Sequence, residues 1–319
     1  MKILHITTNY PTPEYPIFGI FVKEQVESLR NLGLDCDVLY CDRKGRGKWM
    51  YITYIPRIWW RILTGHYDLI HCHHALTAML LMCTGWPLFK KCVVSFQNDP
   101  TTEWSVMNVF GIIHPFFDAI ILKNTSPYLE RSKTVYLPNG CNQDFFRPIE
   151  REVCIARLGL DAGKRYILYM DSNKWGRTQK RQDRFDATVE LLRSKYGHTD
   201  VEAVKLFNTP REEIPYYFNA CAMHMLSSDF EGSPNSVKEC MCCNVPVVST
   251  DVGNVKDMIG DIPGCYVVDQ FTAEALAKAA DQVLTSDKPF SGRERFLAKG
   301  YSMEAVAGRL FDLYKDVCI

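Results

Sequence analysis

The chain has 319 residues, of which 47% are apolar and 23% are charged, so it can bury the cores of two ordinary domains and is not a disordered chain. Lys+Arg and Asp+Glu each number 37, and the resulting net charge of zero argues against a dedicated nucleic-acid binder. Thirteen cysteines, an odd number in which the cluster Cys240, Cys242 and Cys243 has no second pair at metal-ligand spacing, favour reduced and largely buried thiols in a cytosolic protein.

The first part of the chain alternates between strand and helix patterns. The N-terminal pattern over Ile3–Thr7 is typical of a first strand and not of a signal peptide. A Pro-rich loop follows and ends at Gly19. A helical pattern follows and ends at Gly33, where a left-handed cap is expected. The further strands expected here are Cys36–Tyr40, Asp68–His71, Cys92–Phe96, Ala119–Leu122 and Thr134–Leu137. This alternation predicts a parallel sheet with helices on both faces.

A second α/β series follows the turn signal Leu137–Gly140, which predicts a domain linker. The expected strands are Tyr166–Met170, Val201–Phe207, Cys221–Leu226, Val245–Ser249 and Tyr266–Val268, and the expected helices are Phe185–Tyr196, Ala273–Leu284 and Met303–Tyr314. The most apolar stretch of the chain, Ala75–Phe89, is too short to span a bilayer. Two doubly wound domains make a cleft between them the expected ligand site.

The segment 227–259 carries the strongest chemical signal. Ser233 is suited to cap a helix and Pro234 to its first turn, so a helix is predicted to start here with its amides and positive dipole end available to a diphosphate. Glu231 then lies in the loop before the helix, and Glu239 lies about two turns along it. Taken one by one, these residues also fit an ordinary surface loop with one solvated carboxylate.

The whole string resembles the signature of the group 1 glycosyltransferases, a large retaining family of the GT-B type. The resemblance rests on the spacing from Glu231 to Glu239, on the strand at Val245–Val248 and on the turn Asp251–Gly253 that follows. It extends to the loop Tyr10–Gly19, the strand Asp68–His71, the boundary Leu137–Gly140 and the last helix. The resemblance implies an α/β GT-B fold in which two doubly wound, Rossmann-like domains face a central cleft. It places the acceptor-side domain at 1–140 and the donor-binding domain at 141–300, with the helix 301–319 packing back on the first.

Specific roles follow from this resemblance. It implies that Glu239 holds the ribose hydroxyls of the nucleotide and that Glu231 contacts the donor sugar. The remaining donor contacts that it implies are Gly19, Gly232, Ser233, Pro234, Asn235 and Ser236. It also implies a Lys and an Arg that neutralise the leaving diphosphate, for which Lys180 and Arg177 are the candidates and Lys174 the substitute. The alternative for this basic loop is a solvated surface.

Two features depart from the family or look at first like another kind of site. Gln97 stands where the family usually has a His, so Gln97, Asn98 and Asp99 are expected to bind the sugar or the acceptor and not to move a proton. His71, His73 and His74 have no carboxylate or Cys partner at a useful spacing, which argues against a metal site.

The stretch Arg43–Arg61 contains six Lys and Arg, five aromatic residues and no acid. This composition predicts a segment that lies on an anionic membrane surface, and therefore a cytoplasmic protein held peripherally on the inner face of the cell membrane. The alternative is a core or interdomain helix with a basic face. Nucleic acid could bind such a stretch too, but nothing else in the chain supports it.

The predicted function is retaining transfer of a sugar from a UDP- or GDP-sugar to a hydroxyl of a lipid-linked or cell-surface glycan, a hexosyltransferase activity of class EC 2.4 that needs no metal or cofactor. Two alternatives stay open. One is a different enzyme on the same fold, such as a nucleotide-sugar epimerase or a phosphorolytic enzyme. The other is a non-catalytic binding or scaffold subunit, which would suit Gln97 and a second domain with room for only one short strand, Val201–Phe207, between Tyr196 and Arg211.

Overall fold

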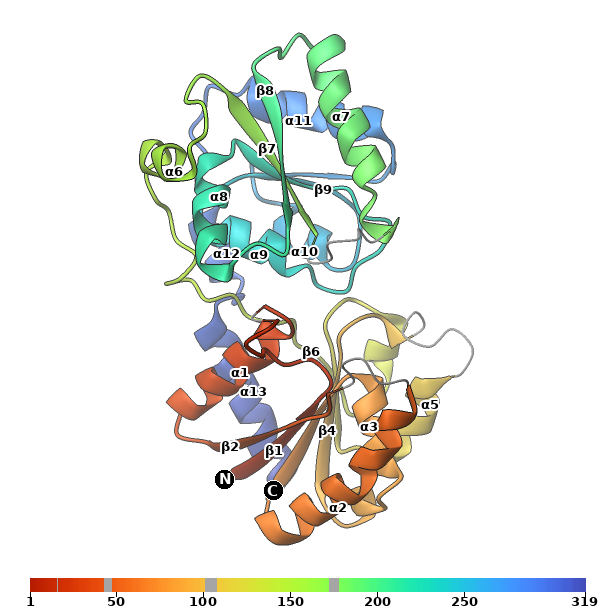
Figure 1. The fold of residues 1–319 in the computed structure, drawn as a ribbon. Coiled ribbons are helices and arrows are strands. Elements are labelled where there is room, and N and C mark those ends of the chain that lie inside the picture. The colour runs from red at the N-terminus through yellow and green to blue at the C-terminus, as the bar shows by residue number, and fades with distance from the viewer. Residues whose placement is uncertain (16, 43–47, 101–107, 172–177) are drawn as a thin grey trace. The chain divides into compact units, whose positions relative to one another are not determined.

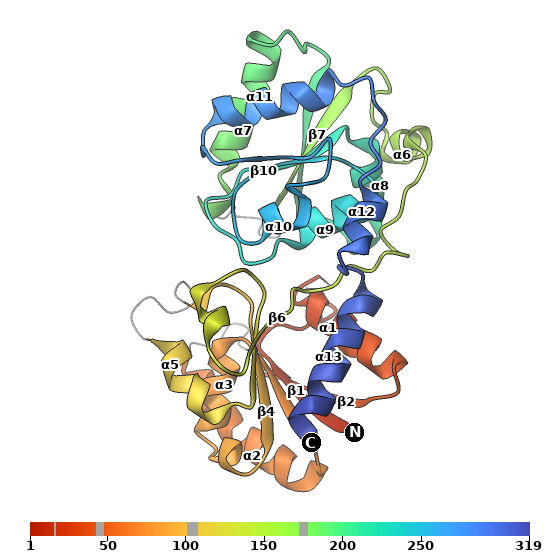
Figure 2. The ribbon, with the colours of Figure 1, turned by 180° about the vertical axis from the view of Figure 1, so that it is seen from behind.

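A computed structural model describes residues 1–15, 17–42, 48–100, 108–171 and 178–319. The chain forms two compact units (Figures 1 and 2). The first unit comprises Met1–Gly140 and Met303–Ile319, and the second comprises Cys141–Ser302. Each unit is built on one parallel sheet with helices on both faces, so the predicted α/β class with two doubly wound domains is confirmed.

The sheet of the first unit has six parallel strands in the order β2-β1-β3-β4-β5-β6. The strands are β1 (Lys2–Thr7), β2 (Asp35–Tyr40), β3 (Leu69–His73), β4 (Lys91–Phe96), β5 (Ala119–Leu122) and β6 (Thr134–Tyr136). The central strands β1 and β3 are almost fully buried, as expected of a parallel sheet covered on both faces. Strand β3 runs two residues beyond its predicted end at His71, so His73 also lies in the sheet.

Helices cover both faces of this sheet. Helices α1 (Ile20–Asn31) and α13 (Met303–Cys318) lie on one face, and α2 (Tyr54–Gly65), α3 (Ala75–Met82) and α5 (Val109–Ile113) on the other. Short 3-10 turns are η1 (Lys48–Thr53), η2 (Trp86–Leu88), η3 (His114–Phe116) and η4 (Pro127–Glu130). The C-terminal helix α13 packs beside α1 and buries Leu310 and Tyr314 completely (Figure 2).

The sheet of the second unit has five parallel strands in the order β11-β10-β9-β7-β8. The strands are β7 (Arg165–Asp171), β8 (Val201–Phe207), β9 (Met223–Leu226), β10 (Val247–Thr250) and β11 (Tyr266–Val268). Helices α7 (Gln182–Ser194) and α11 (Ala273–Leu284) cover one face, and α6 (Arg151–Leu158), α8 (Ile214–Ala220), α9 (Asn235–Cys242), α10 (Val255–Ile259) and α12 (Arg293–Ala298) cover the other. The 3-10 turns are η5 (Thr178–Lys180) and η6 (Arg211–Glu213).

In each sheet, two neighbouring strands are followed by helices that lie on opposite faces of the sheet. In the first unit, β1 and β3 are neighbours, but α1 and α3 follow them on opposite faces. In the second unit, β7 and β9 are neighbours, and α7 and α9 follow them on opposite faces. Such a switch point opens a crevice at the carboxyl ends of the strands, where ligands of open α/β sheets bind.

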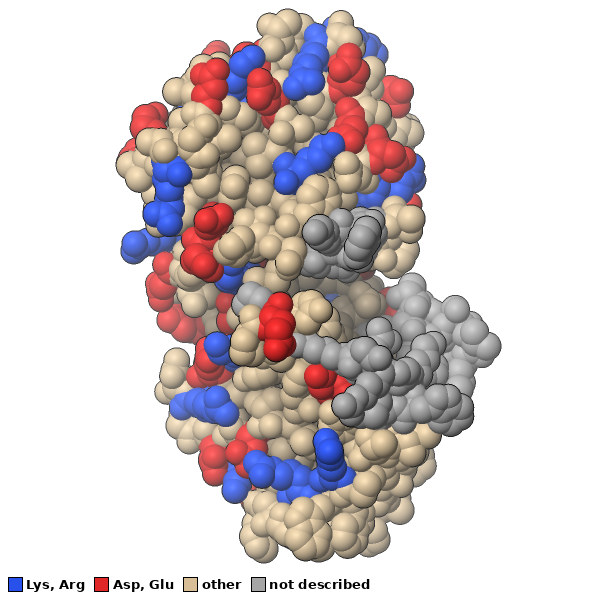
Figure 3. Space-filling model, viewed as in Figure 1, with Lys and Arg blue, Asp and Glu red and all other residues tan. Residues whose placement is uncertain are grey.

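The cysteines are free and mostly buried, as the composition predicts. All thirteen cysteines are free thiols within the described part of the chain, and all but Cys83 and Cys318 are buried. Among the described residues, basic and acidic side chains are interspersed over the visible face of the second unit (Figure 3). Among the described residues, the model holds no helix with the length and apolar character needed to cross a membrane.

Candidate functional site

Helix α9 follows β9 at the switch point of the second unit, as the sequence predicts, but it begins differently. The helix starts at Asn235, and Pro234 is the extended residue before it, with φ −65° and ψ 118°. Ser233 therefore does not cap the helix, and its buried Oγ has no hydrogen-bond partner among the described residues. The predicted cap was wrong because the extended Pro234 takes the cap position, and the Ser233 carbonyl accepts from Lys238 within the helix.

Lys238 is a fully buried residue that the sequence analysis did not single out. Its Nζ donates to the Ser233 carbonyl at 3.2 Å and to Asn235 Oδ1 at 3.1 Å, which fixes the chain where it enters α9. Burial lowers the pKa of Lys238 to about 7, although the neighbouring Glu239 opposes this shift. Because an amphipathic helix pattern places Lys on the solvated face, no local signal reveals this role.

Glu231 lies in the loop between β9 and α9, where it was predicted, and its carboxylate is already engaged. Glu231 Oε1 accepts from Lys180 Nζ at 2.6 Å and from Ser228 Oγ at 2.8 Å. The Lys180 and Glu231 side chains are each 12% exposed, so the ion pair is largely withdrawn from water. Gly253 packs beneath this loop with φ 57°, and a Cβ at this position would lie 2.1 Å from the Gly232 carbonyl oxygen, so glycine is required there.

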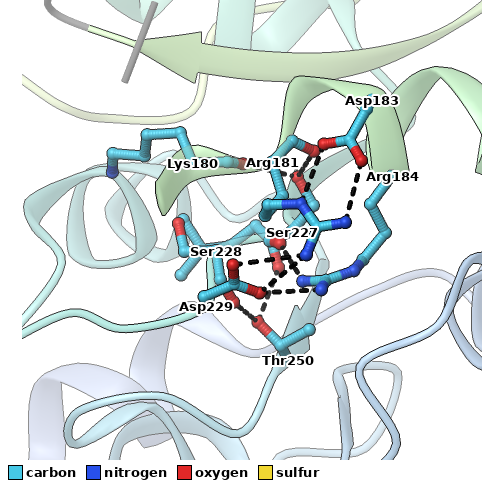
Figure 4. A network of polar contacts seen from close by, with 9 residues as sticks. Lys180, Arg181, Asp183, Arg184, Ser227, Ser228, Asp229 and Thr250 are labelled. Carbon is cyan, nitrogen blue, oxygen red and sulfur yellow. Dashed lines mark hydrogen bonds and ion pairs between the residues drawn. The ribbon is translucent and has the colours of Figure 1, made fainter. Parts of the chain in front are cut away.

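Side chains and backbone join the loop after β9 to the start of α7, as Figure 4 shows. Ser227 Oγ donates to the carbonyls of Lys180 and Arg181 at 2.9 and 3.0 Å. Arg184 donates to the Ser227 carbonyl at 2.6 Å and to Asp229 Oδ1 at 2.7 Å, and Arg181 also binds Asp229. The Lys180 side chain points away from this network (Figure 4). The network thus leaves Lys180 directed to Glu231, while Arg181 and Arg184 hold the loops together.

The two other predicted basic residues of this loop, Arg177 and Lys174, lie outside the described residues. Their expected role beside Lys180 therefore stays a prediction.

Glu239 lies two turns along α9, as predicted, and pairs with a residue that the sequence analysis missed. Arg211 Nη1 donates to Glu239 Oε1 at 2.6 Å, with the two side chains 17% and 8% exposed. Arg211 belongs to η6, between β8 and α8, and is 28 residues away in the sequence. Its guanidinium also lies over the ring of Phe146, with 4.7 Å from Cζ to the ring centroid.

Ser236, another predicted donor contact, is bound to a buried histidine of β9. Ser236 Oγ lies 3.0 Å from His224 Nε2, and His224 Nδ1 lies 3.0 Å from the Leu168 carbonyl. Burial is the largest cause that lowers the pKa of His224 to about 4, so the ring is neutral at pH 7. Since Nδ1 faces a carbonyl, it carries the proton, and Nε2 accepts from the Ser236 hydroxyl. Ser236 can therefore offer a ligand its backbone amide more readily than its hydroxyl proton.

The predicted residues of the first unit lie at the carboxyl edge of its own sheet. Gln97, Asn98 and Asp99 follow β4, and Asn139 Nδ2 donates to Gln97 Oε1 at 3.3 Å. Gly19 stands directly before α1 with φ 70°. A Cβ at this position would lie 2.3 Å from the Asn9 carbonyl group, so only glycine lets the N-terminal loop fold back here.

Three fully buried histidines form a cluster at the switch point of the first unit. His5 of β1 joins His71 and His73 of β3, and one ring nitrogen of each lies within 4.8 Å of the others. His5 and His73 are hydrogen-bonded at 3.1 Å. The sequence analysis missed His5, because its partners belong to another strand.

His71 has both of its ring nitrogens engaged within the fold. They are hydrogen-bonded to Tyr314 of α13 at 2.5 Å and to Ser95 of β4 at 2.8 Å. Burial lowers the pKa of His5 to about 3 and that of His71 and His73 well below the usual value, so the rings are neutral. Among the described residues, the possible metal ligands gathered here are these three imidazoles, without a carboxylate or a thiolate.

Comparisons with known proteins bear on this arrangement. Residues 186–303 match the family model "Glycosyl transferases group 1", a region that contains Arg211, Glu231 and Glu239. The chain is 24% identical to the Bacillus subtilis (strain 168) protein named "Putative teichuronic acid biosynthesis glycosyltransferase TuaC", covering 88% of each chain. These matches confirm the predicted family resemblance.

Solved structures agree on the fold. The chain is similar to sucrose-phosphate synthase (tll1590) from Thermosynechococcus elongatus, with a TM-score of 0.79, 18% identity and coverage of 99% and 98% of the two chains. It is also similar to Anabaena Alr3699/HepE in complex with UDP-glucose, with a TM-score of 0.75, 12% identity and coverage of 99% and 100%. These likenesses confirm the GT-B fold class.

Proposed function

We propose that this chain, which is similar to the group 1 glycosyltransferases, moves a sugar from a nucleoside-diphosphate sugar to a hydroxyl acceptor with retention of the anomeric configuration. One observation carries the proposal. Two carboxylates on one short segment, Glu231 and Glu239, are each paired with a cation from a different loop at the carboxyl edge of the second sheet. In a donor where a diphosphate lies between two sugars, fixed cations can bind the phosphates and fixed carboxylates can accept from the sugar hydroxyls.

In the proposed complex, the donor lies along the entrance to α9. Glu239 accepts hydrogen bonds from the ribose hydroxyls, and the amides at Asn235 and Ser236 face the diphosphate, which a helix N-terminus favours. Glu231 accepts from hydroxyls of the transferred sugar. Lys180, held by Glu231, reaches the diphosphate with its remaining N–H donors.

The proposed chemistry proceeds on one face of the sugar. The bond between the anomeric carbon and the phosphate oxygen breaks, and the oxygen keeps the electron pair. The acceptor oxygen then bonds to the anomeric carbon from the same face and gives its proton to the leaving phosphate oxygen. We assign no covalent nucleophile, because Glu231 is committed to Lys180 and Ser228. Lys180 and the helix amides meet the charge that grows on the diphosphate, with Arg177 or Lys174 as further candidates, so the proposed mechanism uses no metal.

We propose a lipid-linked or cell-surface glycan as the acceptor, and a position on the inner face of the cell membrane. The described part of the basic and aromatic segment forms η1 and α2. Trp59, Trp60 and Leu63 of α2 are 43%, 63% and 44% exposed, so large apolar side chains face outward beside the cations of this helix. Arg43, Lys44 and Arg46 lie outside the described residues and belong to the same proposal.

Product analysis with a panel of donors tests the proposed transfer. Thermal unfolding with UDP-, GDP- and ADP-sugars identifies the donor, because a ligand that binds only the native state raises the unfolding temperature. The identified donor, incubated with a glycolipid extract, is expected to yield free nucleoside diphosphate and an elongated glycan of retained configuration. An epimerised donor would indicate an epimerase, and binding without any product would indicate a scaffold subunit.

Sedimentation with vesicles tests the membrane surface. Wild-type protein is expected to bind vesicles rich in phosphatidylglycerol at low salt, and the double variant Trp59→Ser/Trp60→Ser to bind them several-fold less. The matched control is Leu32→Ser, which removes an exposed apolar side chain from the region after α1. Wild-type protein that ignores these vesicles at low salt would refute the proposal.

A further inference from the structure

We infer that Arg211 is a positioning residue for nucleotide recognition, which sets the Glu239 carboxylate in the orientation that the ribose hydroxyls require. The inference rests on the proposed function, since it concerns how Glu239 meets the donor. It adds a residue that lies outside the segment from Glu231 to Glu239 and that comes from a different loop.

The contact between the two residues is short and sheltered. Arg211 Nη1 donates to Glu239 Oε1 at 2.6 Å, and the glutamate side chain is only 8% exposed. A charged carboxylate at that depth without a cationic partner carries a large desolvation cost. Arg211 therefore decides where this carboxylate lies and which of its oxygens stays open to a ligand.

Arg211 is itself held in place by aromatic rings. Its guanidinium lies over Phe146, which is fully buried, and over the half-exposed Phe145, with 4.7 and 5.8 Å to the ring centroids. A planar guanidinium can stack on a ring and donate in its own plane at the same time, whereas a lysine ammonium cannot do both. The cation thus presents one fixed N–H direction to Glu239.

The geometry of the carboxylate explains why this fixed direction matters for the donor. A carboxylate offers two oxygens, and Arg211 occupies Oε1. The plane of the group is then set, so that Oε2 and the remaining lone pair of Oε1 are presented in one arrangement. Two adjacent ribose hydroxyls need such a defined pair of acceptors, and a carboxylate free to rotate would lose part of the hydrogen-bond strength.

A purely structural role for Arg211 would have a different signature. If the ion pair only stabilised α9, its loss would lower the unfolding temperature and weaken every nucleotide equally. A positioning role instead predicts a loss that is confined to ligands that carry both ribose hydroxyls. The discrimination between UDP and its deoxy analogues separates the two.

Calorimetry with UDP, 2′-deoxy-UDP and 3′-deoxy-UDP provides the test, with the guanosine series used instead if the wild type binds GDP. Wild type is expected to bind the ribonucleotide at least about tenfold more tightly than either analogue, as one hydrogen bond to a charged group implies. Glu239→Ala should lose this discrimination. Arg211→Met should reduce it to about threefold or less, and Arg211→Lys should be intermediate. Arg165→Met is the matched control, since it removes an Arg–carboxylate pair with Asp200 elsewhere in the same unit and should keep the wild-type ratio.

The outcomes are separable. Arg211→Met with wild-type discrimination would overturn the inference while leaving the proposed function intact. Wild-type protein that binds neither UDP nor GDP would overturn the proposed function itself. If Arg211→Met does not fold, as judged by thermal unfolding, Arg211→Lys decides, and full discrimination in that variant would equally contradict the inference.

Discussion

The carboxyl edges of the two sheets share a topology but differ in charge. At the switch point of the second unit, Lys180–Glu231 and Arg211–Glu239 are ion pairs whose side chains stay partly accessible. At the switch point of the first, His5, His71 and His73 are neutral and fully buried. The fold alone therefore does not decide what such an edge can bind.

The cost of desolvation explains why this difference in charge between the two edges matters for ligand binding. Burying two charges costs several kcal/mol per ion, which a protein interior rarely recovers from the pair alone. Ion pairs that keep 8–17% of their side-chain surface exposed, as these do, can lower this cost and can also exchange partners with an incoming ligand. The neutral imidazoles bind each other, Ser95 and Tyr314, whereas His5 Nε2 and His73 Nδ1 are buried without a hydrogen-bond partner among the described residues. We expect the second edge to carry ligand chemistry and the first to carry structure.

Of the changes proposed here, the loss of Lys180 is expected to reduce turnover most. Lys180→Ala is expected to lower kcat by about 10²–10³, because its charge opposes the charge that develops on the leaving diphosphate. The rise in donor KM should be smaller. Steady-state kinetics beside Lys164→Ala, which removes an exposed pair with Glu202, checks this. Equal activity in Lys180→Ala would mean that the basic loop is only solvated surface.

Glu231→Gln sharpens the assignment of the two glutamates. The change keeps volume and hydrogen bonding but removes the negative charge that favours positive character on the sugar ring. Turnover is expected to fall at least about tenfold, or about 1.4 kcal/mol of barrier, with nearly unchanged affinity for the free nucleoside diphosphate. Calorimetry and kinetics on the same variant measure both. Lost nucleotide binding with preserved turnover would show that Glu231 and Glu239 have exchanged roles.

The pH dependence of stability tests whether burial lowers the pKa of Lys238. Its pKa is lowered to about 7 in the folded state, whereas an unfolded lysine titrates near 10.4, so between these values the unfolded state binds more protons. Wild-type stability should therefore rise with pH above about 7, relative to Lys238→Met, by at most about 1.4 kcal/mol per pH unit. Urea unfolding of both proteins at pH 6.5 and 8.0 measures the difference, in which the titration of cysteines cancels. Parallel pH dependence in the two proteins would contradict the buried, weakly basic amine.

The histidine cluster should give the smallest effect. Zinc or EDTA is expected to change the unfolding temperature of the wild type by less than about one degree, because a ligand of the native state must bind to shift it. Differential scanning calorimetry of wild type and His5→Asn measures this. A rise of several degrees with zinc in the wild type alone would make the first edge a metal site and remove the contrast between the two units.

The sequence predicts the local features of the site well. The spacing from Glu231 to Glu239 and the strand before it depend on periodicity within one segment, and the structure places both glutamates accordingly. The start of α9 was predicted one residue too early, because the extended Pro234, and not Ser233, takes the cap position. Lys238 meanwhile binds the Ser233 carbonyl from within the helix.

Two of the contacts that the sequence does not predict are non-local. Arg211 meets Glu239 across 28 residues, and His5 meets His73 across 68. Each pair is formed by the order of strands in its sheet, which a single sequence specifies only through the whole fold. The residue types themselves gave no signal, since a lone Arg before a helix or a lone His in a strand is common.

Hydrogen–deuterium exchange with and without nucleoside diphosphate tests the central claim, that the nucleotide binds at the charged edge of the second unit. Addition of UDP, or of GDP if that is the nucleotide bound, is predicted to slow exchange most in peptides that cover Glu231–Glu239. Peptides from the loop Gln97–Asp99 and from β1 should change little. Protection concentrated in the first unit, with none in Glu231–Glu239, would contradict the account.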